Sequence, residues 1–180
     1  MISSILKSML VIYFLVISTV YNTAIANQDQ RLFKAAFIYN FAKFTRWPKN
    51  LEDDDKDKIV LCTLGEDQLV IDLTRLKGKT LNNRILAVKS FEDPNECNML
   101  YISTSKHINY ARTLNKIREK PILTISEIKN FAQSGGIIEL NHDKGQTRIT
   151  INLNAAHENN LELSSRLLIL ANIINDKPSK

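Results

Sequence analysis

Residues 32–48 read Leu-Phe-Lys-Ala-Ala-Phe-Ile-Tyr-Asn-Phe-Ala-Lys-Phe-Thr-Arg-Trp-Pro, and they predict the helix on which the rest of the chain packs. The stretch holds four of the seven phenylalanines and the only tryptophan. These phenylalanines are Phe33, Phe37, Phe41 and Phe44. Their spacing places all four on one face of a helix, which ends before Pro48 because the residue preceding a proline avoids helical conformation. Fully burying one such side chain stabilises by about 1.5–3 kcal/mol, so this aromatic helix is the predicted centre of the core.

N-terminal to the aromatic helix, the chain carries the pattern of a secretory signal peptide. Lys7 precedes an apolar run at residues 9–20, and Ala24-Ile25-Ala26 is a small-x-small cleavage site. We predict a signal peptide at residues 1–26 and a single domain at residues 27–180. An uncleaved membrane anchor is the alternative, although the run is shorter than the roughly 20 residues of a spanning helix. A bacterial periplasm is the expected destination.

Composition narrows the choice of partners. The formal net charge of the full chain is +5, and the acidic residues at 52–55 lie beside Lys56 and Lys58. A surface of mixed sign on a secreted protein argues against nucleic acid as a partner. The two cysteines, Cys62 and Cys97, favour a disulfide in an oxidising compartment, with two buried free thiols as the alternative.

C-terminal to the aromatic helix, strand and helix patterns alternate. Strands are predicted at residues 58–65, 84–88, 98–103 and 121–125. Helices are predicted at residues 67–76, from Ser103 to about 120, and at 127–133. Residues 136–141 and 148–153 flank a turn containing Gly145 and predict an antiparallel hairpin. A last helix is expected to begin near residue 155 or 161 and to carry apolar side chains as far as Ile174.

This order of elements predicts an α/β three-layer sandwich. We expect a mostly parallel sheet of about six strands, about five helices and a C-terminal antiparallel hairpin. The aromatic helix and the last helix are expected to pack on the sheet.

The sequence shows no catalytic constellation. Gly65 ends the first predicted strand, at a position where α/β folds often bind ligands, but the G-x-G-x-x-G pattern is missing. The three histidines lie apart without metal-ligand spacing, and no serine sits in a G-x-S-x-G elbow. We predict a protein that is not an enzyme and that needs neither a cofactor nor a metal.

One polar cluster is a candidate pocket for a ligand or partner. Asn40 and Lys43 interrupt the aromatic helix, and Arg148 and Asn152 lie on one face of a predicted strand, with Thr150 between them. The alternative is that Asn40 and Asn152 satisfy buried backbone groups.

Several segments together resemble the YfiR family of periplasmic regulators. The resemblance begins at residues 34–48 and continues through residues 59–65. Cys97–Ser103 is similar to the family pattern C-x-x-L-[FY]-I-S. The remaining similar segments are Gly78-Lys79 and residues 121–126, 131–132, 135–138, 151–156 and 163–168. The resemblance implies the fold of that family and a disulfide between Cys62 and Cys97.

The resemblance also implies a function. Known members bind the periplasmic sensor domain of an inner-membrane diguanylate cyclase and keep the enzyme inactive, which lowers cyclic di-GMP and biofilm formation. An outer-membrane OmpA-like lipoprotein can sequester the regulator. Some members carry a second cysteine pair, which this chain lacks. A periplasmic small-ligand sensor or solute-binding module with another membrane partner is the alternative, and a homodimer stays open.

Overall fold

The computed structural model of the protein describes residues 31–48, 57–143 and 146–175. The chain divides into two compact units, Met1–Phe33 and Lys34–Lys180, and the fold below is that of the second. The predicted signal peptide and the acidic residues at 52–55 lie outside the described residues. Within the described ranges, no helix is both long enough and apolar enough to cross a membrane.

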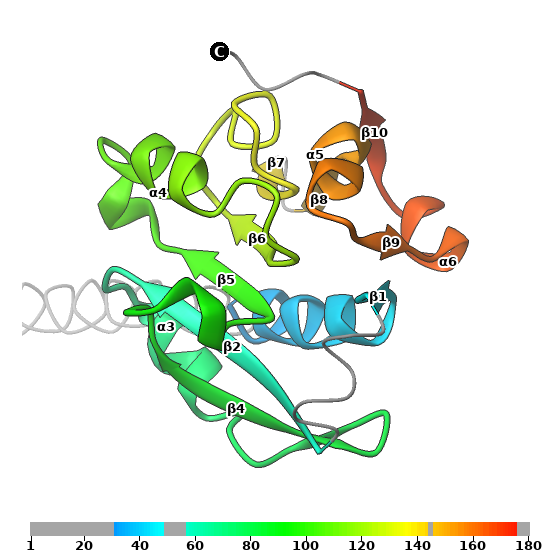
Figure 1. Ribbon diagram of the computed structural model, residues 1–180. Coiled ribbons are helices and arrows are strands. Elements are labelled where there is room, and N and C mark those ends of the chain that lie inside the picture. Colours follow the sequence, from blue (N-terminus) through cyan, green and yellow to red (C-terminus); the bar gives the residue numbers. More distant parts are fainter. Residues whose placement is uncertain (1–30, 49–56, 144–145, 176–180) are drawn as a thin grey trace, which may run out of the picture. The chain divides into compact units, whose positions relative to one another are not determined.

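An eight-stranded sheet forms the centre of this unit (Figure 1). Its strands are β2 (Lys58–Leu64), β3 (Thr80–Leu81), β4 (Arg84–Ser90), β5 (Met99–Ile102), β6 (Leu123–Ser126), β7 (Ile138–Asp143), β8 (Gln146–Asn152) and β10 (Asn172–Ile174). Their order across the sheet is β10-β8-β7-β6-β5-β2-β4-β3. Neighbouring strands are parallel except in the β3–β4 and β7–β8 pairs. A separate antiparallel pair joins β1 (Thr45–Arg46) to β9 (Glu162–Leu163).

The predicted fold class is confirmed, whereas the expected number of strands is too low. The four predicted strands and the hairpin are present, as β2, β4, β5, β6 and β7–β8. The two additional strands, β3 and β10, lie at the two edges of the main sheet. Strands of two or three residues are too short to show an alternating pattern, so they cannot be predicted from the spacing of apolar residues.

Helices cover both faces of the sheet. The helical segments are residues 31–43, α3 (Gln68–Thr74), α4 (Tyr110–Lys116), α5 (Leu153–Glu158) and α6 (Ser165–Leu168), with the 3-10 turns η1 (Pro94–Glu96) and η2 (Thr104–Lys106). Along β5, Met99 and Tyr101 lie in the main core with the aromatic helix and α3. Leu100 and Ile102 lie in a second core with Ile117, which follows α4. A parallel sheet buried on both faces therefore forms the middle of three layers.

The aromatic helix packs on the sheet with a different face from the predicted one. Phe41 is 1% exposed, but Phe37 and Phe44 are half-buried and Phe33 is 64% exposed. The buried stripe runs instead through Ala35, Ile38, Phe41 and Ala42. Small and aliphatic side chains let the helix lie close to the sheet, which favours dense packing of the core.

The two helices predicted between β5 and β7 differ from the observed elements. The first is shortened to α4, because residues 104–106 form η2. The second, at residues 127–133, is wrong, since these residues form turns and Asn130 has a left-handed φ of 61°. Buried Glu139 accepts hydrogen bonds from the backbone N–H groups of Asn130 and Ala132, both at 3.1 Å. Its carboxylate supplies acceptors that a helix would have supplied from its own carbonyls.

The predicted last helix is wrong over most of its length. Helix α5 ends at Glu158, and Asn160 adopts a left-handed φ of 54°. The chain then forms β9, α6 and β10 in succession. Strand β10 pairs in parallel with β8, with Ile173 opposite Ile151. This pairing joins residues far apart in the sequence, so the local spacing of apolar residues does not reveal it.

Candidate functional site

The carboxyl ends of β2 and β5 meet where the connections of the sheet change direction. From β2 the chain crosses to β4 on one side, and from β5 it crosses to β6 on the other. Ligands of α/β proteins bind outside the carboxyl ends of strands at such a switch point. Gly65 follows β2 and Ser103 follows β5, so the glycine turn singled out from the sequence lies at this point.

A partly buried charged network lies beside the switch point. The Tyr101 hydroxyl donates to Asp67 Oδ2 at 3.1 Å and lies 3.4 Å from Glu127 Oε2. Lys34 on the aromatic helix forms an ion pair with Glu127, and the Lys34 side chain is 11% exposed. Asp67 Oδ1 also accepts the Val70 N–H at 2.8 Å and so caps α3. The network connects the aromatic helix, β5 and the loops after β2 and β6.

The electrostatics of this network keep Tyr101 neutral. Burial raises the pKa of its hydroxyl, and the negative charges of Asp67 and Glu127 raise that pKa further, well above the ordinary tyrosine value. The phenol therefore stays protonated at neutral pH. It serves as a hydrogen-bond donor to the carboxylates and not as a base.

Alkaline pH tests the protonated state of Tyr101. The unfolded chain releases this proton near pH 10, whereas the folded chain keeps it. The free energy of unfolding should therefore fall above about pH 10, by up to about 1.4 kcal/mol per pH unit, because the stabilisation that Tyr101 contributes below that pH is lost. In Tyr101→Phe this loss is absent. Urea unfolding at about pH 9 and pH 11 should show a smaller decrease for the variant than for the wild type. Equal decreases in the two proteins would show that Tyr101 does not hold its proton.

The loops after β2 and β5 close over the switch point. Gly65 has a φ of 96°, and a Cβ built there would lie 2.6 Å from Ser105 Oγ. The Glu66 N–H donates to Ser105 Oγ at 3.2 Å, and the Ser103 N–H donates to the Leu64 carbonyl at 2.9 Å. The close approach requires glycine at position 65. These hydrogen bonds hold the two loops together at the switch point.

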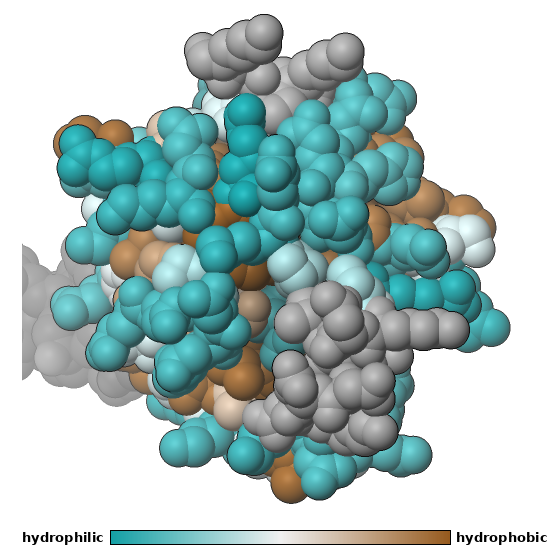
Figure 2. Space-filling view, in the orientation of Figure 1, coloured by the Kyte–Doolittle hydropathy of each residue, from teal (hydrophilic) through white to brown (hydrophobic). Residues whose placement is uncertain are grey.

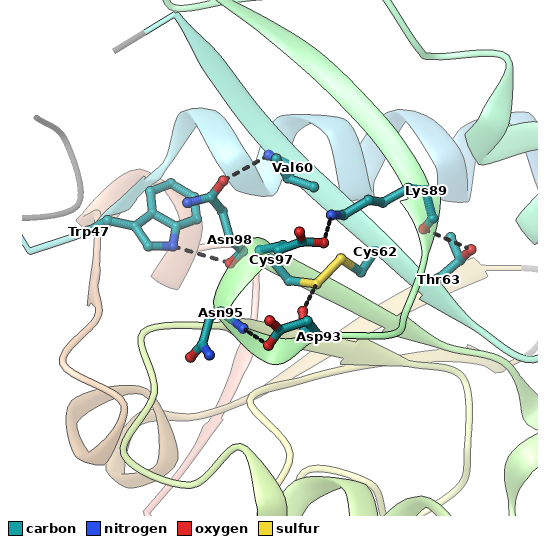
Figure 3. The surroundings of a disulfide bond; sticks show 10 residues. Trp47, Val60, Cys62, Thr63, Lys89, Asp93, Asn95, Cys97 and Asn98 are labelled. Atoms are coloured by element: carbon teal, nitrogen blue, oxygen red, sulfur yellow. Dashed lines mark hydrogen bonds and ion pairs between the residues drawn. A yellow bond between two sulfur atoms is a disulfide. The ribbon is translucent and has the colours of Figure 1, made fainter. Parts of the chain in front are cut away.

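The aromatic helix segment is attached to the sheet at both of its ends. Lys34 pairs with Glu127 at the carboxyl end of β6. The indole N–H of Trp47 donates to the Asn98 carbonyl at 3.2 Å, just before β5 begins (Figure 3). Residues 34–48, which carry the opening motif of the sequence, therefore span the sheet between two polar attachments.

The predicted disulfide between Cys62 and Cys97 is confirmed, and the alternative of two free thiols is wrong. Cys62 lies on β2 and Cys97 follows η1, with their Cα atoms 5.8 Å apart. Figure 3 shows the polar contacts around the bridge. Asn98 Oδ1 accepts the Val60 N–H at 2.8 Å, which joins the same two segments. The bridge and this hydrogen bond together fix β2 to the start of β5.

The four residues of the predicted pocket occupy two different elements. Asn40 is half-buried on the aromatic helix, and Lys43 is exposed with its Nζ 4.8 Å from the centre of the Tyr39 ring. Arg148 is exposed on β8. Asn152 is fully buried; it donates to the Ala132 carbonyl at 2.8 Å and accepts the Ala155 N–H at 3.1 Å.

These contacts give Asn152 the structural role considered as the alternative, namely the satisfaction of buried backbone groups. Two surface cavities are lined by other residues. The smaller, of about 220 Å³, lies between α4 and α5, and the larger, of about 360 Å³, lies beside Cys97. A pocket formed by Asn40, Lys43, Arg148 and Asn152 stays a prediction. Among the residues that the structure describes, no group of three or more His, Cys, Asp or Glu side chains could hold a metal ion.

The charged network was missed by sequence reasoning, although one signal for it was present. Asp67 and Glu127 each follow a predicted strand, and polar residues at the carboxyl ends of neighbouring parallel strands meet. Using that signal requires the strand order, which places β5 between β2 and β6. No pattern in the sequence indicated that Lys34 belongs to this network, since a lysine within an aromatic helix usually points to solvent.

The fold and its bridge define a three-layer α/β protein with one disulfide. A sequence model of the YfiR/HmsC-like family matches residues 32–172, from the aromatic helix to the start of β10. The chain belongs to this family, which supports a periplasmic regulator in general terms. A comparison with curated proteins finds no match.

Proposed function

We propose that this protein is a periplasmic regulator that binds the periplasmic sensor domain of an inner-membrane diguanylate cyclase and keeps the enzyme inactive. The result is less cyclic di-GMP and less biofilm. The observation that carries this proposal is the family match over residues 32–172. The protein acts by binding and has no catalytic role of its own.

Two features of the chain support a periplasmic site of action. The disulfide between Cys62 and Cys97 is of a kind that persists in oxidising compartments. The signal-peptide pattern at residues 1–26 would direct the chain out of the cytoplasm. In the periplasm the protein meets both the sensor domain of the cyclase and an outer-membrane OmpA-like lipoprotein. The lipoprotein would compete for the regulator and so release the cyclase.

Cyclic di-GMP measured in a deletion strain tests the proposal. Without the regulator the cyclase is free, so cellular cyclic di-GMP should rise above the parent level, and expression of the wild-type gene should restore it. Deleting the partner cyclase as well should remove the rise. An unchanged level in the single deletion, with the protein detected in the periplasm of the parent, would contradict the inhibitory function.

The cavity beside the disulfide supports a second candidate function, that of a small-ligand sensor. Its volume of about 360 Å³ falls within the usual range of ligand pockets. Val60 and Ile122 provide apolar walls, and Lys58 and Lys120 line the same cavity. Native mass spectrometry of protein purified from its own periplasm discriminates between the candidates. A stoichiometric small molecule on the protein favours the sensor, and an empty protein argues against it.

A further inference from the structure

The smaller of the two cavities is separate from the one beside the disulfide and has a different lining. Its volume is about 220 Å³, and its walls come from α4, from α5 and from the turn before β7. It shares no lining residue with the larger cavity. Hydrophilic side chains predominate in the upper half of Figure 2, over the elements that Figure 1 labels α4 and α5. We name this smaller cavity the α4–α5 cavity.

Two side chains of opposite charge line the α4–α5 cavity without forming an ion pair. Arg118 lies two residues beyond the end of α4, and Glu158 is the last residue of α5. Both are exposed. Within the described residues, the Arg118 guanidinium and the Glu158 carboxylate take part in none of the ion pairs or side-chain hydrogen bonds of the fold. Both groups are therefore available to charged groups of a ligand.

The remaining walls combine apolar and uncharged polar side chains. Ile117 and Ala155 are buried and Leu114 is half-buried, and together they give the cavity an apolar side. Asn115 contributes a side-chain amide and Ser134 a hydroxyl, and within the described part of the chain neither group has a hydrogen-bond partner. Apolar walls with a few polar groups directed at one space are the usual composition of a small-molecule site.

Two buried asparagines fix the walls of the cavity relative to each other. Asn152 accepts the N–H of Ala155 at the start of α5 and donates to the carbonyl of Ala132 in the turn before β7. Asn159, at the end of α5, accepts the N–H of Glu119 at 3.1 Å, just beyond α4. The three walls are thus already placed before a ligand arrives, which lowers the entropic cost of binding.

We propose that the α4–α5 cavity binds a free α-amino acid with a small aliphatic side chain. The ligand carboxylate would accept hydrogen bonds from the Arg118 guanidinium, and the ligand ammonium would lie at the Glu158 carboxylate. The aliphatic side chain would contact Leu114 and Ala155. This site goes beyond the proposed function and does not depend on a partner cyclase.

Other classes of ligand match the lining less well. An anion would be attracted by Arg118 but repelled by Glu158, and a cation would meet the reverse arrangement. A neutral molecule would displace water from both ionised groups without replacing the lost hydrogen bonds. The cavity is also smaller than the roughly 300–1,000 Å³ of pockets for drug-sized ligands, so a nucleotide or a peptide would not fit.

Calorimetric titration of the mature protein with L-valine tests the proposal. Arg118→Ala and Glu158→Gln should each raise the Kd about tenfold or more, because each removes one charge-assisted contact. Arg112→Ala is the matched control, since Arg112 is an exposed arginine of α4 that does not line the cavity, and its Kd should equal that of the wild type. Isovalerate lacks the ammonium and isobutylamine lacks the carboxylate, so both should bind much more weakly than L-valine.

Backbone amide chemical shifts place the ligand on the protein. L-valine should shift the amide signals of residues 115–118, 134–135 and 158–159, and the three variants should keep the wild-type urea midpoint. Absence of binding at tens of millimolar L-valine overturns the proposal, as does unchanged affinity in Arg118→Ala. Isovalerate or isobutylamine binding as tightly as L-valine overturns the class of ligand. Each of these results leaves the proposed regulation of a cyclase unaffected, since that function is measured by cyclic di-GMP in the cell.

Discussion

Reduction of the disulfide between Cys62 and Cys97 is expected to lower the free energy of unfolding by about 3–4 kcal/mol. The two cysteines lie 35 residues apart, and the enclosed segment contains α3, β3, β4 and η1. Without the bridge the unfolded chain gains the freedom to separate these residues. In the chain-entropy model a loop of this length accounts for a stabilisation of that size.

Urea unfolding with and without reductant measures the effect of the bridge. The double variant Cys62→Ala/Cys97→Ala is the matched control, because its unfolding midpoint should not respond to reductant. The variant should resemble the reduced wild type, with a further loss from the volume removed at Cys62, which is fully buried. Identical midpoints of the oxidised and reduced wild type would show that the bridge does not stabilise the fold.

Phe41→Ala should lower the free energy of unfolding by about 3–5 kcal/mol. Phe41 is 1% exposed and belongs to the main core between the aromatic helix and the sheet. Its ring also stacks on Phe37 with the ring centres 6.3 Å apart. Removing the ring leaves a cavity that the sheet below cannot fill, so most of the cost should appear as lost stability.

Phe33→Ala on the same helix is the control for this prediction. Phe33 is 64% exposed, so the same substitution there should change the free energy of unfolding by no more than about 0.5 kcal/mol. Denaturant unfolding of both variants compares the two positions directly. If Phe33→Ala cost as much as Phe41→Ala, the helix would pack with the aromatic stripe predicted from the sequence and not with the observed face.

The success of the strand predictions has a physical basis. β2 and β5 are buried on both faces, so nearly every residue in them is apolar and the run is visible without knowledge of its neighbours. The hairpin of β7 and β8 was visible because its alternation and turn are local. The errors lie where local patterns are ambiguous. The spacing of leucines and isoleucines at residues 163–174 fits a helix. Residues 172–174 nevertheless form a strand, because β10 pairs in parallel with β8.

The candidate site was less predictable than the fold. Asn152 was chosen as a candidate pocket residue because it lies in an alternation of polar residues. In the structure Asn152 is the N-cap of α5 and donates a buried hydrogen bond to the Ala132 carbonyl. The Lys34, Tyr101 and Glu127 network joins three elements that are separated in the sequence. A buried charge is acceptable only where partners meet it, and the identity of those partners depends on which strands are neighbours.

By itself the sequence determined the fold class, the pair of cysteines, the central helix and the family, because each of these depends on local patterns or on ordered motifs along the chain. The tertiary structure alone decided which face of the helix is buried, that Lys34 meets Glu127, and that β10 forms the last strand of the main sheet. These features depend on the order of strands in the sheet. That order is set by contacts between distant residues, whose energies no local window of the sequence contains.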